Sequence, residues 1–102
     1  MNIDEMIEQL LGMNIARENN VVVFSHEARE LVHKIAGRCS TIPTVVNAQE
    51  QTVTYAKGMS AEELYIDMLA KIAHAPSRLH MMMSARILIP VISQKLKEET
   101  DI

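Results

Sequence analysis

The sequence predicts an α+β fold that is predominantly helical, with its elements in the order α-β-α-β-β-α-α. Three observations predict it. Serine or asparagine capping signals precede segments whose apolar residues recur at helical spacing. Stretches rich in β-branched residues interrupt these segments and predict a small antiparallel sheet. The last apolar segment has no polar face, so we expect it to be the central helix of the domain.

The N-terminal part is expected to contain two helices separated by a strand. Asn2 can cap the first helix, which is predicted to end near Arg17. Residues 21–24 are a β-branched run that predicts a strand, or alternatively the start of the next helix. Ser25 can cap the second helix, which we expect to end within residues 37–41.

The middle of the chain, residues 41–58, is predicted to form a β-hairpin. Pro43 disfavours a helical conformation at Ile42. Residues 44–46 and 52–55 are both β-prone, and the residues between them are polar and typical of a turn.

The C-terminal part is predicted to form two helices. Ser60 opens the first with a capping box, and Pro76 ends it. The second is expected to span residues 78–98 with a kink or break at Pro90, which lacks an N–H; residues 86–92 could alternatively form a strand. On a helical projection its apolar residues point in nearly every direction: Leu79, Met81, Met82, Met83, Ala85, Ile87, Leu88, Ile89, Val91 and Ile92.

Composition places the chain among globular intracellular domains. Its length of 102 residues predicts one domain over residues 1–102. The single cysteine, Cys39, does not indicate an oxidising compartment, and the acidic residues after Met1 are unlike a basic leader. The apolar stretch 79–92 is shorter than the roughly 20 residues that cross a bilayer. We therefore expect a cytoplasmic protein.

A DNA-binding alternative comes from the charge distribution. The net charge of −3 argues against a dominant nucleic-acid surface. Residues 68–97, however, contain no acidic residue. They carry five cationic residues: Lys71, Arg78, Arg86, Lys95 and Lys97. The helical hairpin of residues 61–97 could therefore serve a small transcriptional regulator.

A second alternative is a binder of a small anionic ligand such as a nucleotide. Arg78 and His80 lie at the start of the last helix, where backbone N–H groups and the helix dipole favour an anion. Arg86, on a mostly apolar helix, needs a carboxylate, the surface or a bound anion.

No residue pattern predicts an enzyme, a metal site or a cofactor. His26, Glu30 and His33 share one helix face at spacings that can bind zinc, but an ordinary Glu–His pair on a solvated face explains them. Cys39 is expected to be a buried core thiol. The solitary glycines exclude a phosphate-binding loop: Gly12, Gly37 and Gly58.

The leading prediction is a small non-enzymatic interaction or regulatory module that acts as a homodimer or higher oligomer, suited by size to a phage or mobile-element accessory protein. An all-round apolar helix over residues 79–92 exceeds what so short a chain can comfortably cover. Met81 and Met82 could form core or a pliable docking surface. The residues expected to contact a ligand or partner are Arg78, His80, Met81, Met82 and Arg86.

Overall fold

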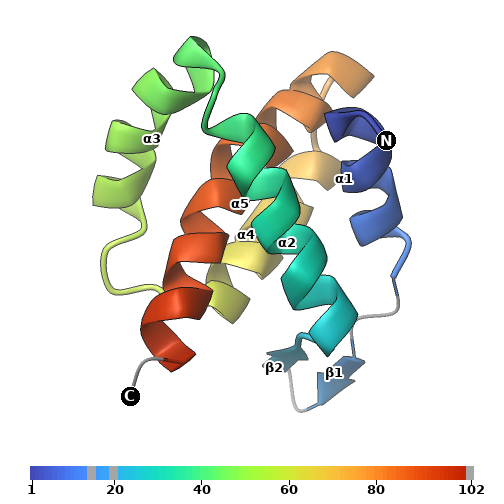
Figure 1. Ribbon diagram of the computed structural model, residues 1–102, viewed down its shortest axis with the longest axis vertical. Coiled ribbons are helices and arrows are strands. Elements are labelled where there is room, and N and C mark those ends of the chain that lie inside the picture. Colours follow the sequence, from blue (N-terminus) through green and yellow to red (C-terminus); the bar gives the residue numbers. More distant parts are fainter. Residues whose placement is uncertain (14–15, 19–20, 101–102) are drawn as a thin grey trace.

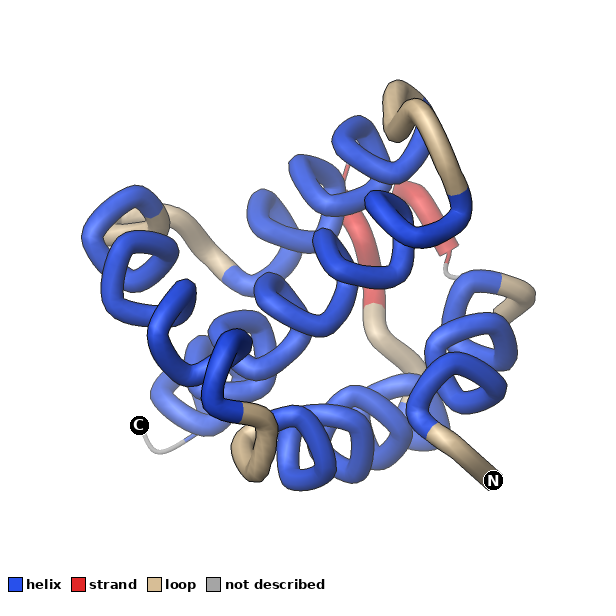
Figure 2. Tube along the Cα trace, turned by 90° about the horizontal axis from the view of Figure 1, so that it is seen from above, coloured by secondary structure: helices blue, strands red, loops and turns tan. Residues whose placement is uncertain are grey.

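Helices surround one long central helix in the computed structural model, which describes residues 1–13, 16–18 and 21–100 (Figure 1). The central helix is α5 (Arg78–Thr100). Helices α2 (His26–Cys39), α3 (Pro43–Tyr55) and α4 (Ala61–Ala73) each pack against it. Helix α1 (Ile3–Leu11) packs on α2 and reaches α5 (Figure 2).

The predicted α+β fold is wrong, because the segment expected to form the hairpin is helix α3. Pro43 is the first residue of this helix, a position where its fixed φ suits the helix and its missing N–H is not required. The Thr52 hydroxyl donates a hydrogen bond to the Ala48 carbonyl one turn earlier, at 3.1 Å. Val45 is fully buried in the core. Burial of a β-branched side chain thus outweighs a weak local preference for strand.

Strand structure in the described ranges is limited to one short antiparallel pair. Strands β1 (Ala16–Glu18) and β2 (Val21–Val23) are three residues each, with Arg17 opposite Val22. The predicted extension of the first helix to Arg17 is therefore wrong. Helix α1 ends at Leu11, and Gly12, a poor helix former, occupies its C-cap position. The pair lies at one end of α2 and forms no sheet layer (Figure 1).

The three predicted N-caps are confirmed. In each case the side-chain oxygen accepts a hydrogen bond from the backbone N–H three residues later, at 2.8 Å for Asn2 and 3.1 Å for both Ser25 and Ser60. Helix α2 ends at Cys39, and α4 ends at Ala73 before Pro76. These starts depend on local chemistry, which explains why the sequence alone locates them.

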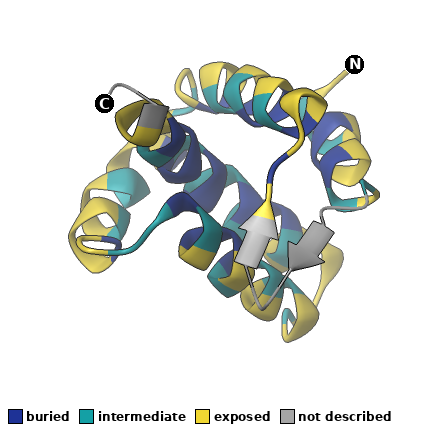
Figure 3. Ribbon diagram, turned by 90° about the horizontal axis from the view of Figure 1, so that it is seen from below, coloured by how far each residue is buried: buried dark blue, intermediate teal, exposed yellow. Residues whose placement is uncertain are grey.

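Helix α5 continues through Pro90 without a break, so the strand alternative for residues 86–92 is wrong. Its buried residues face the other helices on several sides (Figure 3): Met82, Ala85, Leu88, Ile89, Val91, Ile92, Ser93 and Leu96. The chain covers most of its own apolar helix, because α3 supplies a flank that the sequence did not predict. None of the helices in the described ranges combines the length and apolarity needed to cross a bilayer.

Candidate functional site

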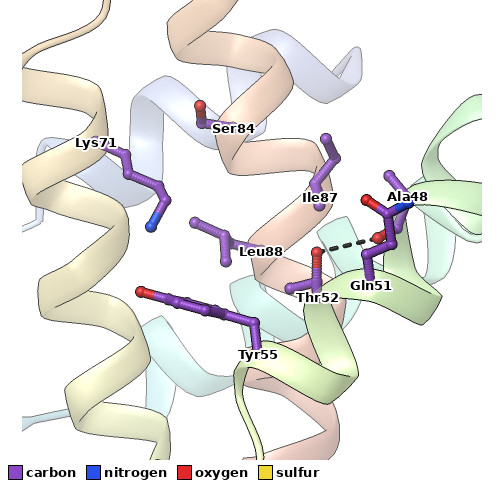
Figure 4. Close-up of a pocket in the computed structure, with 8 residues that line it drawn as sticks. All are labelled: Ala48, Gln51, Thr52, Tyr55, Lys71, Ser84, Ile87 and Leu88. Atoms are coloured by element: carbon purple, nitrogen blue, oxygen red, sulfur yellow. Dashed lines mark hydrogen bonds between the residues drawn. The ribbon is translucent and has the colours of Figure 1, made fainter.

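A groove opens between α3, α4 and α5, with a cavity volume of about 350 Å³ (Figure 4). We call it the apolar groove, since most of its surface is carbon. Its lining residues come from three helices: Ala48, Gln51, Thr52, Tyr55, Lys71, Ser84, Ile87 and Leu88. Such a volume, with a few polar groups at the margin of an apolar surface, is typical of binding sites.

The groove exists because α3 is held to the core at few points. Val45 is the one fully buried residue described within α3, and Ala56, just beyond its end, is buried as well. Between them, the small side chains of Ala48 on α3 and Ser84 on α5 leave space unfilled. The sequence pattern did not predict this site, because it placed these α3 residues in a hairpin.

Tyr55 and Lys71 form the polar margin of the apolar groove. The Tyr55 hydroxyl donates a hydrogen bond to Asp67 Oδ1 at 3.1 Å, and Lys71 Nζ lies 2.5 Å from Asp67 Oδ2. The same ammonium lies 4.9 Å from the centroid of the Tyr55 ring, within range of a cation–π contact. The hydrogen bond to Asp67 is the main reason that the pKa of Lys71 is raised. Lys71 is therefore held as a cation rather than as a free amine that could act as a base or nucleophile.

The two arginines predicted to hold an anion both pair with carboxylates of α1. Arg78 forms an ion pair with Glu8, and Arg86 Nη2 lies 2.6 Å from Asp4 Oδ1. The Nε of Arg86 is buried and has no hydrogen-bond partner among the described residues. The charges that sequence reasoning assigned to a ligand thus join the first helix to the last.

The remaining predicted contact residues differ from one another in burial. His80 Nδ1 lies 2.7 Å from the Ser77 hydroxyl oxygen, in a local turn that opens α5. Met82 is buried in the core, and Met81 is partly buried against it. Met82 therefore serves packing, while Met81 keeps some exposed surface.

The three candidate zinc ligands separate into two different environments. His26 Nε2 lies 3.1 Å from Glu30 Oε1, and both side chains are exposed, as expected for an ordinary Glu–His pair. The expectation that His33 shares their solvated face is wrong, because its Nδ1 lies 2.6 Å from the hydroxyl oxygen of Ser93 on α5. In the part of the chain that the structure describes, no three His, Cys, Asp or Glu side chains are placed to hold a metal ion.

The His33–Ser93 contact is a polar feature that the sequence reasoning missed. Ser93 is buried in the middle of α5. The pKa of His33 is lowered chiefly by burial, and then by the positive charges of Lys97 and Arg29. The available signal for this contact was Ser93 itself, a serine at a position of α5 whose buried neighbours are apolar.

Cys39 is a fully buried free thiol, which confirms the core reading. Burial is the largest influence on its pKa and raises it, although Arg86 and Arg38 act in the opposite direction. A thiol with a raised pKa and no access to solvent is a poor nucleophile.

No protein-family model, curated protein or solved structure matches this chain. The proposals below therefore rest on the chain's own geometry.

Proposed function

We propose that this protein is an interaction module and that the apolar groove docks an apolar side chain from an amphipathic helix of a partner protein. The observation that carries the proposal is the open cavity of about 350 Å³ between α3, α4 and α5. Helices commonly bind in this way, by laying their apolar face into a groove formed by other helices.

The composition of α3 supports this docking surface. Among its thirteen residues Glu50 alone is charged. Tyr55, a large aromatic residue that lines the apolar groove, remains exposed. The cores of protein interfaces are depleted of charge and enriched in tyrosine, whereas solvated helices normally carry many charges.

The margin of the groove has the character of an interface rim. Asp67 and Lys71 pair beside the Tyr55 hydroxyl and can hydrogen-bond to polar groups of a bound helix. Because Lys71 is kept protonated, its role is recognition rather than proton transfer. We place this activity in the cytoplasm, in keeping with the free thiol of Cys39.

The partner can still be a second copy of this chain. The reason that the sequence offered for self-association, an uncovered apolar helix, no longer holds. The other helices cover most of the apolar surface of α5, so that surface does not require a second copy. The DNA and anion alternatives are less favoured, because Lys71, Arg78 and Arg86 each have a carboxylate partner that competes with phosphate.

A photocrosslinking experiment tests the docking surface. A benzophenone amino acid replaces Gln51, which lines the groove, in the cells that naturally make the protein. The matched control places it at Lys34, an exposed position on α2 that lines a separate cavity beside α1. A second variant, Ala48→Phe, fills the groove in the Gln51 background.

We expect one discrete product from position 51 that is absent from position 34 and lost in the filled variant, with the melting temperature of that variant near the parent value. A product of twice the monomer mass identifies a second copy as the partner. A product that persists when the groove is filled, or no product at position 51, contradicts the proposal.

A further inference from the structure

A second groove lies along the opposite edge of α3, over the C-terminal half of α5. It consists of two adjoining cavities with volumes of about 520 Å³ and 260 Å³. The two share Gln49, Pro90 and Gln94 as lining residues. Residues near the end of α3 line one cavity, and residues of α2 line the other. We call them together the basic groove.

The charge of the basic groove is opposite to that of the whole chain. Lys57, Lys95 and Lys97 line it, and Glu98 is the single carboxylate among its lining residues. The chain as a whole carries a net charge of −3. A local concentration of cations on an acidic protein points to an anionic partner for that surface.

Two lysines of this groove, Lys57 and Lys95, differ from the paired cations elsewhere on α4 and α5. Lys71, Arg78 and Arg86 each lie within ion-pair distance of a carboxylate. Neither Lys57 nor Lys95 has a carboxylate of the described residues within that distance. Their charges are therefore available to a partner without breaking an internal pair.

Two polar side chains line the side of the groove that faces α2. The buried Ser93 hydroxyl and the His33 imidazole meet at 2.6 Å on the α2 side of the groove. Burial lowers the pKa of His33 most, and the positive charges of Lys97 and Arg29 lower it further.

We propose that the basic groove binds an acidic segment of a partner protein, with Asp or Glu carboxylates of that segment meeting Lys57, Lys95 and Lys97. The amides of Gln49 and Gln94 can hydrogen-bond to the backbone of an extended peptide. Val53 and Pro90 offer apolar contact to its aliphatic side chains.

A peptide is favoured over a nucleic acid as the occupant. The described lining residues include no arginine to bind phosphates in a bidentate manner, and no Phe, Tyr or Trp ring on which a base could stack. Glu98 would also repel a continuous phosphate backbone. This inference does not depend on the apolar groove, which lies along the other edge of α3.

The test uses a short fluorescein-labelled peptide of alternating Glu, Asp, Ser and Leu, titrated with the full chain at low salt. Its control peptide has Gln and Asn in place of Glu and Asp. Fluorescence anisotropy measures affinity, and amide chemical shifts in NMR spectra locate the contact. A labelled single-stranded oligonucleotide is titrated in parallel.

We expect the acidic peptide to bind, the neutral peptide not to bind, and the amides of Ser93 and Gln94 to shift. The double variant Lys57→Glu/Lys95→Glu should weaken binding about tenfold or more, since it reverses two charges that line the groove. Lys34→Glu/Arg38→Glu is the matched control, because it reverses two charges on an exposed surface outside the groove, and it should change affinity much less.

Three results overturn the proposal. These are binding of both peptides alike, absence of acidic-peptide binding at low salt, and tighter binding of the oligonucleotide than of the peptide. A fourth result, equal weakening by the matched control variant, also overturns it, because it indicates attraction to the surface as a whole. Melting curves near the parent value establish that both variants fold.

Discussion

Helices α2 and α3 have similar lengths and both pack against α5, yet they are built in different ways. Helix α2 has fourteen residues, buries five of them and carries five Asp, Glu, Lys or Arg side chains. Helix α3 has thirteen residues, all of them described. Val45 is its one buried residue, and Glu50 is its one charged residue. A helix held at few points leaves grooves along both of its edges. The difference indicates that α2 contributes more to the core, while α3 leaves a groove along each of its edges.

The largest expected effect on stability comes from truncating a buried side chain of α2. Ile35→Ala removes a fully buried side chain of α2. We expect a loss of about 2–5 kcal/mol in the free energy of unfolding, because the substitution loses apolar burial and leaves a cavity. Urea denaturation measures it. A loss under about 1 kcal/mol would mean that α2 is not the support described above.

A smaller loss in the free energy of unfolding is expected from truncating the buried side chain of α3. Val45→Ala should cost about 1–2 kcal/mol, since fewer methyl groups leave the core. Because Val45 anchors α3 almost alone, amide hydrogen exchange should accelerate in α3 and stay slow in α2. Uniform acceleration over both helices would show that α3 does not open separately from the rest.

The next effect concerns the start of α2. Ser25→Ala removes the hydroxyl that accepts the Ala28 N–H at 3.1 Å. Loss of a serine cap typically costs about 1 kcal/mol, which thermal or urea unfolding can detect. Ser40→Ala, at the other end of α2 and exposed, is the control and should cost less. Equal losses would argue against the capping bond as the cause.

The smallest effect is a pH dependence from His33. Burial, followed by Lys97 and Arg29, lowers its pKa in the folded state. As the pH falls below about 6.5 the unfolded chain therefore takes up a proton first, and stability declines until the folded-state pKa is passed. Above about pH 6.5 the imidazole is neutral in both the folded and the unfolded chain, and His33 causes no loss of stability there.

Melting temperatures at about pH 7.5 and about pH 5.5 check this pH dependence. His33→Gln should reduce the decrease between the two values, whereas His74→Gln, at the exposed end of α4, should not. An unchanged decrease in the His33 variant would assign the pH dependence to other groups.

The candidate sites were only partly predictable. Arg86 was expected to require a carboxylate, the surface or an anion, and the structure supplies the carboxylate of Asp4, distant in sequence. The contact between His33 and Ser93 joins positions sixty residues apart. No spacing pattern along one helix contains such a pair, because it depends on how two helices pack. Both grooves depend in the same way on where α3 lies.

By itself, the sequence determined the helix starts at Asn2, Ser25 and Ser60, the buried thiol of Cys39 and the central position of the last helix. Capping and an all-round apolar surface are properties of neighbouring residues, so they can be read without the fold. Only the tertiary structure decided that residues 43–55 form a helix. Their strand preference is worth about 1 kcal/mol or less, and burial of Val45 against α5 outweighs it.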